Sequence, residues 1–148
     1  MMNTPTKKVE TFFSKYQTQD KTVLDQLDEV IKEAGLFDDE QKENYRDLMK
    51  KQYQNFSYKI KDETVDGNSA KVVAEIEVYN YGKAINESEV YLANNRSEFV
   101  VSEEDDSIDF KKFLDYKIEK MSQIKEKIKY TINFTLTKDD KEWKLDDI

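Results

Sequence analysis

The closing segment of this chain restricts its fold more than any other part. From Ile128 to Leu136 every second residue is apolar or aromatic, and the residues between are Lys, Thr and Asn. A period of two is typical of a β-strand that buries one face and exposes the other. The apolar face needs a cover, and the nature of that cover decides the fold.

An earlier hairpin is expected around Gly67, because apolar residues alternate with polar ones on both sides of it. A two-residue Asp66-Gly67 loop would set apolar against acidic side chains on one face. We therefore predict a three-residue loop, with Gly67 or Asn68 at positive φ. This loop gives three apolar pairs: Ile60 with Ala74, Tyr58 with Ile76 and Phe56 with Val78.

The closing hairpin is expected to turn on the two residues Asp139 and Asp140. Such a turn places Leu136 opposite Trp143, so that one face of the sheet is buried and the other is exposed to solvent.

Three amphipathic helices are expected before the first hairpin. Thr4 followed by Pro5 predicts the start of the first, because Thr is a favourable N-cap and Pro fits the first helical turn. Asp20 caps the second, Gly35 ends it in the left-handed conformation, and Asp38 begins the third. We expect these helices to cover the sheet with three apolar stripes: Val9, Phe12, Phe13 and Tyr16; Val23, Leu24, Leu27, Val30, Ile31 and Ala34; Tyr45, Leu48, Met49 and Tyr53.

A polar helical insertion of about residues 82–126 separates the two hairpins. We predict two helices in it, the second capped by Ser107, and mobility over residues 94–106. The element order predicts an α+β fold with N-terminal helices packed on a curved antiparallel sheet of about four strands. With 148 residues, of which 37% are hydrophobic, the chain is expected to form a single domain over residues 1–148.

The composition excludes several function classes. A net charge of -8 disfavours nucleic acid and anionic membrane surfaces as partners. The chain has no His and no Cys, which removes the commonest general base, thiolate nucleophiles and the usual zinc ligands. A catalytic carboxylate would have to be buried, and the strand residues Glu75 and Glu77 face away from the expected core. We therefore expect no catalytic residue, no metal and no cofactor.

The stretch "SEEDDSIDF" is rich in the oxygen ligands that calcium needs, but it lacks the glycine and the ligand spacing of an EF-hand loop. We interpret these carboxylates as acidic residues placed before the positive N-terminus of a helix. They are Glu103, Glu104, Asp105, Asp106 and Asp109.

Tyrosines are the best candidates for a binding site, because an aromatic ring with a hydroxyl group suits a pocket wall. The alternative is that they fill the edge of the core. The candidate ligand-binding residues are Tyr58, Tyr79, Tyr81, Tyr116 and Tyr130.

The ends of the chain, "TPTKKVETFFSKYQTQD" and "EWKLDDI", resemble the nuclear transport factor two-like (cystatin-like) superfamily. More narrowly, they are similar to uncharacterised lipoproteins of low-GC Gram-positive bacteria, in which such a domain follows a leader peptide and a lipidated cysteine. The resemblance implies a cone-like fold with a cavity. It also implies an extracytoplasmic protein that is anchored to the membrane by an N-terminal lipid, whose cysteine is not in this sequence.

We therefore expect a non-catalytic, extracytoplasmic binding module for a small molecule or an envelope protein. Two alternatives stay open. One is an enzyme that uses a Tyr and carboxylate pair in the cone cavity, and the other is a structural subunit whose partner covers an exposed aromatic patch at Tyr79 and Tyr81. The sequence also leaves open a homodimer.

Overall fold

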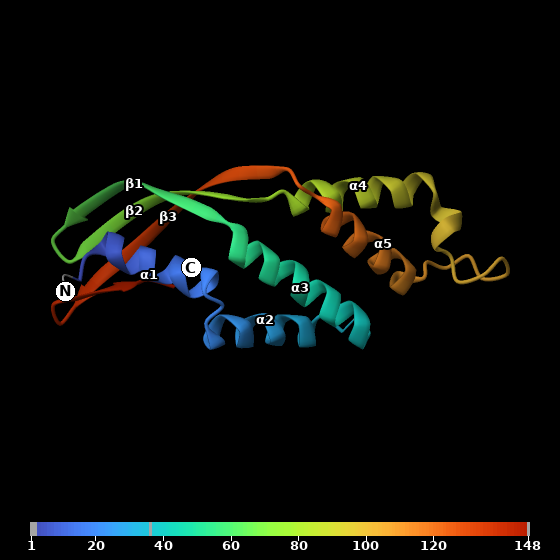
Figure 1. Cartoon of the computed structure of the whole chain (residues 1–148), viewed down its shortest axis with the longest axis horizontal. Coiled ribbons are helices and arrows are strands. Elements are labelled where there is room, and N and C mark those ends of the chain that lie inside the picture. The colour runs from blue at the N-terminus through green and yellow to red at the C-terminus, as the bar shows by residue number, and fades with distance from the viewer. Residues whose placement is uncertain (1–2, 36, 148) are drawn as a thin grey trace. The chain divides into compact units, whose positions relative to one another are not determined.

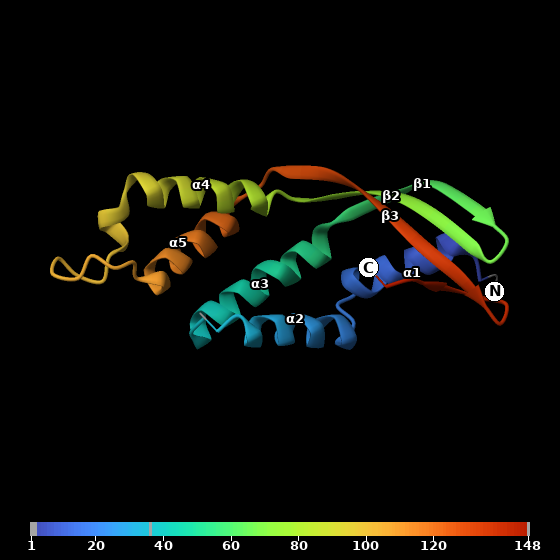
Figure 2. The same cartoon turned by 180° about the vertical axis from the view of Figure 1, so that it is seen from behind.

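The computed structural model describes residues 3–35 and 37–147, and it confirms the predicted α+β class with helices packed against an antiparallel sheet. Figures 1 and 2 show the elements from opposite sides. In chain order they are α1 (Pro5–Gln17), α2 (Lys21–Glu33), α3 (Asp39–Asn55), β1 (Ser57–Asp66), β2 (Ser69–Tyr79), α4 (Tyr81–Asn94), the 3₁₀ helix η1 (Arg96–Phe99), α5 (Phe110–Gln123), β3 (Lys127–Asp139) and β4 (Glu142–Leu145).

The chain forms two compact units. The sheet unit consists of Met1–Val23, Tyr53–Val78 and Lys127–Ile148, and the helical unit consists of Leu24–Gln52 and Tyr79–Glu126. Each unit is therefore assembled from separate stretches of the sequence. The helical unit contains the predicted insertion between the hairpins, and the single-domain assignment stays a prediction.

The sheet has the strand order β1-β2-β3-β4. In the first hairpin, Tyr58 lies opposite Ile76 and Ile60 lies opposite Ala74, so these two predicted pairs are confirmed. The end of β3 lies beside the start of β2, where the Lys138 backbone N–H donates to the Asn68 carbonyl at 2.8 Å. These pairings place the apolar residues of both hairpins on one face.

The predicted three-residue loop of the first hairpin is wrong. Asp66 pairs with Ser69, which leaves the two-residue turn Gly67-Asn68 with Gly67 at a φ of 60°. Glycine at the first position is typical of the two-residue turns that match the twist of a hairpin. A register shift between Ile60 and Asp62 then restores the expected apolar pairs, because a bulge absorbs one residue of β1.

The predicted turn of the second hairpin is also wrong, by one residue at each position. Asp139 pairs with Glu142, so the turn is formed by Asp140 and Lys141, at φ values of 52° and 69°. Trp143 consequently lies opposite Lys138 rather than Leu136. A shift of two in the pairing keeps every side chain on its face, which is why Trp143 is still buried.

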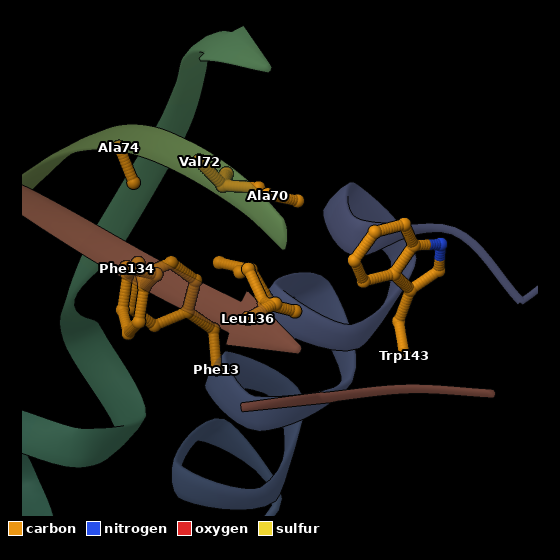
Figure 3. Close-up of a cluster of buried hydrophobic side chains, with 8 residues drawn as sticks. Phe13, Ala70, Val72, Ala74, Phe134, Leu136 and Trp143 are labelled. Atoms are coloured by element: carbon orange, nitrogen blue, oxygen red, sulfur yellow. The ribbon is translucent and has the colours of Figure 1, made fainter. Parts of the chain in front are cut away.

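The sheet unit has a dry aromatic core against α1 (Figure 3). The α1 side chains Val9 and Phe13 are 0% and 4% exposed. The Phe13 ring lies 4.5 Å from that of Tyr58 and 5.5 Å from that of Phe134, measured between centroids. The helical side chains of this cluster come from α1, as predicted for the first helix. That the second and third helices also cover the sheet stays a prediction.

The starts of α1, α2 and α3 follow their predicted caps, and that of α5 does not. The hydroxyl of Thr4 accepts from the Lys7 backbone N–H at 3.1 Å, as expected for α1. The N-cap of α5 is Asp109 and not Ser107. Ser107 instead donates its hydroxyl to Asp105 at 2.6 Å, which closes a turn within the loop before α5. The predicted mobility of residues 94–106 stays a prediction, and four of these residues form η1.

Candidate functional site

The helical unit contains an apolar pocket of about 270 Å³. Residues of α2, α3, α4 and α5 and of the connection before α3 line it. They are Val30, Ile31, Ala34, Phe37, Tyr45, Ile85, Leu114, Lys117, Ile118 and Met121.

The connection between α2 and α3 positions one wall of the apolar pocket. Gly35 has a φ of 69°, a conformation that glycine adopts without steric cost, and α3 begins four residues later. Phe37 lies in this connection, and its ring is 5.3 Å from that of Tyr45 on α3. The connection between α2 and α3 and the first turns of α3 therefore supply an aromatic wall.

The Asp38 side chain fixes the start of α3. Its Oδ1 accepts from the Gln41 backbone N–H at 2.8 Å, and the Gln41 Oε1 accepts from the Asp38 N–H at 3.2 Å, which is a reciprocal capping arrangement. The Gln41 hydrogen bond, aided by Lys111, holds the pKa of Asp38 below its usual value. The cap thus fixes the backbone at the start of α3, directly after Phe37.

The floor of the apolar pocket is the core of the helical unit. Ile118 and Met121 on α5 are 6% and 4% exposed and belong to the buried cluster of this unit. Val30 on α2 also lines the pocket, but it is 61% exposed. The prediction that Val30 belongs to a buried helix face is therefore wrong, because α2 buries a narrower stripe and Val30 lies at its rim.

Two polar groups belong to the lining, Tyr45 and Lys117. The Lys117 Nζ lies 4.9 Å from the centroid of the Phe113 ring, a distance suited to a cation–π contact. Among the lining residues, which all lie in the described part of the chain, there is no carboxylate. Chemically, this arrangement can hold an apolar body with a polar end, and it offers no acid and base pair.

A second, polar groove of about 540 Å³ lies between α3 and α5. Its carboxylates are Glu40, Asp47, Asp115 and Glu119. The side chain of Gln41, which is 1% exposed, donates to Asp115 at 2.7 Å and to the Lys111 carbonyl at 3.0 Å. Within residues 3–35 and 37–147, no three acidic side chains converge as the ligands of a metal ion do.

The structure brings two of the five predicted tyrosines together. The rings of Tyr79 and Tyr81 stack at 6.0 Å. Tyr81 is buried and donates its hydroxyl to the Leu48 carbonyl at 3.0 Å, and burial raises the pKa of Tyr81 to about 12. Lys51 lies over the Tyr79 ring at 5.3 Å. The exposed aromatic patch expected at Tyr79 and Tyr81 is therefore wrong, because Tyr81 is part of the core.

The other three predicted tyrosines are in separate places. Tyr116 stacks on Tyr91 at 4.9 Å in the helical unit. In the sheet unit, Tyr58 packs on Phe13, and burial raises the pKa of Tyr58. Tyr130 is 49% exposed on β3. The five residues do not form one site.

Tyr45, which does line the apolar pocket, was placed by sequence only in the buried stripe of the third helix. The signal that could have found it is local. A wide apolar helix face ends at Gly35, and an aromatic residue, Phe37, stands directly before the next cap. An aromatic residue in so short a connection packs on the first turns of the helix that follows, where Tyr45 lies.

The predicted acidic groups are exposed or half-buried. Glu75 is half-buried, with its carboxylate 3.9 Å from the Lys129 ammonium. In the loop before α5, Asp109 accepts from the backbone of Lys111 at 3.1 Å, which supports the interpretation of this segment as a helix start. Hydrogen bonds from the side chain and backbone of Ser107 lower the pKa of Asp105.

No protein-family profile matches this chain, and no curated protein is similar to it in sequence. Among solved structures, the chain is similar to a candidate lipoprotein (ycdA) from Bacillus subtilis subsp. subtilis str. 168, with 19% identity and a TM-score of 0.43. The match covers 86% of this chain and 42% of that one, so this chain spans less than half of its length. Membership of the nuclear transport factor two-like superfamily stays a prediction.

Proposed function

We propose that this chain is a non-catalytic binding module whose ligand site is the apolar pocket between α2, α3, α4 and α5. The observation that carries the proposal is the lining itself, an apolar wall with the polar groups of Tyr45 and Lys117. Small-molecule sites have this character, with a mostly apolar surface and a few polar groups that orient the ligand. An enzyme with a Tyr and carboxylate pair is the less favoured alternative, because the described lining contains no carboxylate.

The test is a substitution at the mouth of the apolar pocket. Val30→Trp places a large ring at a position that lines the pocket and is 61% exposed, so the helix is expected to fold normally. Val90→Trp is the matched control, because Val90 is 60% exposed on α4 and is not among the lining residues. The probe is 1-octanol, and binding is measured from the methyl NMR shifts of Ile85 and Met121.

We expect 1-octanol to shift these two methyl signals in the native chain and in Val90→Trp. In Val30→Trp the apparent affinity is expected to fall about tenfold or more, which corresponds to about 1.4 kcal/mol. Shifts that spread over the whole chain, or equal binding by the two variants, would contradict the proposal.

We propose in addition that the native protein is tethered to the outer face of the cell membrane by an N-terminal lipid. The support is the resemblance of "TPTKKVETFFSKYQTQD" and "EWKLDDI" to lipoproteins of low-GC Gram-positive bacteria. Within residues 3–35 and 37–147, none of the helices has the length and apolar content that a membrane span requires.

The tether is tested on the native gene and its product. The codons upstream of this chain are expected to encode a leader peptide followed directly by a cysteine, and mass spectrometry of the cellular protein is expected to find that cysteine lipidated at the N-terminus. A complete native gene without such a leader would exclude the tether and leave the pocket proposal untouched.

A further inference from the structure

We infer that the apolar pocket takes a short amphiphile with an anionic head group, a medium-chain carboxylate, and that the Lys117 ammonium holds the head group. This inference rests on the proposed function, because it names the ligand class of the same pocket.

Size favours a short ligand. A volume of about 270 Å³ lies just below the roughly 300–1,000 Å³ of typical small-molecule sites. A long acyl chain does not fit in this space, whereas a chain of about eight carbons or a single ring does. The wall can adapt to an unbranched chain, because Met121 is flexible and polarisable and Phe37 and Tyr45 supply ring faces.

Charge favours an anion. The chain carries 32 acidic and 24 basic residues, yet the single charged residue in the described lining is a lysine. A lining drawn at random from this composition would more often include a carboxylate than a lysine. A cation in an otherwise apolar lining is complementary to the carboxylate of an amphiphile.

The surroundings of Lys117 leave its ammonium available. Lys111, two turns earlier on α5, lies 3.4 Å from Asp38 and 3.9 Å from Asp115. For Lys117, the described residues provide an aromatic ring, that of Phe113 at 4.9 Å, and no carboxylate within ion-pair distance. A cation–π contact leaves the N–H groups that point away from the ring free to donate to a ligand carboxylate.

The test compares three probes with one chain length and different head groups: octanoate, 1-octanol and octylammonium. Each is titrated below its aggregation concentration into the full chain, and the dissociation constant is taken from the methyl shifts of Ile85 and Met121. The variant is Lys117→Met, which keeps the length of the side chain and removes its charge. Lys120→Met is the matched control, because Lys120 also lies over a ring on α5, that of Tyr116 at 5.5 Å, but does not line the pocket.

We expect octanoate to bind roughly tenfold more tightly than 1-octanol, and octylammonium to bind most weakly. Lys117→Met is expected to remove the advantage of octanoate over 1-octanol and to leave the affinity for 1-octanol within about twofold. Lys120→Met is expected to change neither value.

The failures of the inference and of the proposed function are distinguishable. If 1-octanol binds in the pocket as tightly as octanoate, or if Lys117→Met lowers both affinities equally, the anionic head group is excluded while the pocket remains a binding site. If octylammonium binds most tightly, the pocket prefers a cationic head group and the inference is wrong. If no probe shifts the Ile85 and Met121 methyl signals, the proposed function itself fails.

Discussion

The sheet unit and the helical unit are held together in different ways. In the sheet unit, backbone ladders satisfy the peptide groups, and one helix closes a dry cluster in which the Phe13 ring meets three other aromatic rings besides that of Phe12. In the helical unit, side chains tie one element to another. The amide of Gln52 donates to the Tyr79 carbonyl at 3.0 Å and accepts from the Tyr79 N–H at 2.8 Å, and Gln41 joins α3 to α5.

The comparison explains where the apolar pocket lies. A sheet presents a continuous face, and a helix that packs on it can fill the space with large rings. Where polar side chains hydrogen-bond one helix to another, they fix the distance between the helices at those points. The space between two such points can stay unfilled. The pocket at Phe37, Tyr45 and Ile85 is such a gap.

The largest effect is expected from the dry core of the sheet unit. Phe13→Ala removes a ring that is 4% exposed, and the cavity left behind is expected to cost about 3–5 kcal/mol of unfolding free energy. Trp143 is the only tryptophan and belongs to the same buried cluster. Urea unfolding followed by its fluorescence therefore measures the loss in this unit.

Tyr130→Ala is the matched control for this experiment. Tyr130 lies on β3 in the same unit and is 49% exposed, so its substitution is expected to change the unfolding free energy by less than about 1 kcal/mol. Equal losses for the two variants would mean that the stability of the sheet unit does not come from its aromatic core.

A smaller loss of unfolding free energy is expected when the Gln41 hydrogen bonds between α3 and α5 are removed. Gln41→Met conserves the side-chain volume but leaves the Lys111 carbonyl and the Asp38 N–H without their partner. We expect the free energy of unfolding to fall by about 2 kcal/mol. Urea unfolding followed by circular dichroism at 222 nm measures this loss. Gln26→Met, at an exposed position on α2, is expected to cost little. A neutral Gln41→Met would show that apolar contacts alone hold α3 on α5.

The fold class and the starts of the first three helices could be predicted from sequence because local rules decide them. Thr4 and Pro5 mark the start of α1, and alternation marks the strands. The second turn could not be placed, because two hairpin registers that differ by two residues bury the same face. The first could not be placed, because a bulge in β1 compensates for a shift of one residue. Lys141 is not a residue that usually adopts a positive φ in a turn, so the sequence carried no signal for a turn that ends at Lys141.

The candidate site was harder to predict than the fold. A tyrosine on an apolar stripe lines a pocket or fills a core according to how neighbouring helices are spaced. A local pattern can place Tyr45 beside Phe37, but it does not contain the spacing of α4 and α5. Tyr81 was expected near a surface and is buried, whereas Val30 was expected in the core and lies at the pocket rim. The division into two units has the same cause, because it depends on contacts between segments far apart in the chain.

The two hairpin turns allow a finer test within the sheet unit. Gly67→Ala is expected to cost about 1 kcal/mol, because Gly67 has a φ of 60° and nothing lies within 4 Å of the added methyl group, so the cost is that of the backbone alone. Lys141→Gly is expected to stabilise by about 0.5 kcal/mol, since it relieves a φ of 69° on a residue with a Cβ atom. The midpoint of urea unfolding, followed by Trp143 fluorescence, measures both changes in stability. Two changes of the same sign would contradict this account of the turns.

The smallest effect is expected at the cap of α3, and it depends on pH. The backbone hydrogen bond from Gln41, with a contribution from Lys111, holds the folded-state pKa of Asp38 below 3.8. The ionised carboxylate therefore stabilises the fold at pH values above 3.8, and this contribution is lost as the pH falls through the lowered folded-state pKa. Asp38→Asn keeps the cap but cannot ionise. The native chain is thus expected to be more stable than the variant at pH 7, and the difference is expected to vanish at acidic pH. Urea unfolding at a series of pH values, followed by circular dichroism at 222 nm, measures it.

Lys111→Met separates the two contributions to that pH dependence. The Lys111 ammonium lies 3.4 Å from the Asp38 carboxylate, but both side chains are exposed and salt screens their attraction. Since the Gln41 hydrogen bond is the larger cause of the lowered pKa, the advantage of Asp38 over Asn at pH 7 is expected to persist in the Lys111→Met background and in 0.5 M salt. If the advantage disappears in either condition, the ion pair is what stabilises the start of α3, and the first turn of this helix depends on surface charge instead of on its cap.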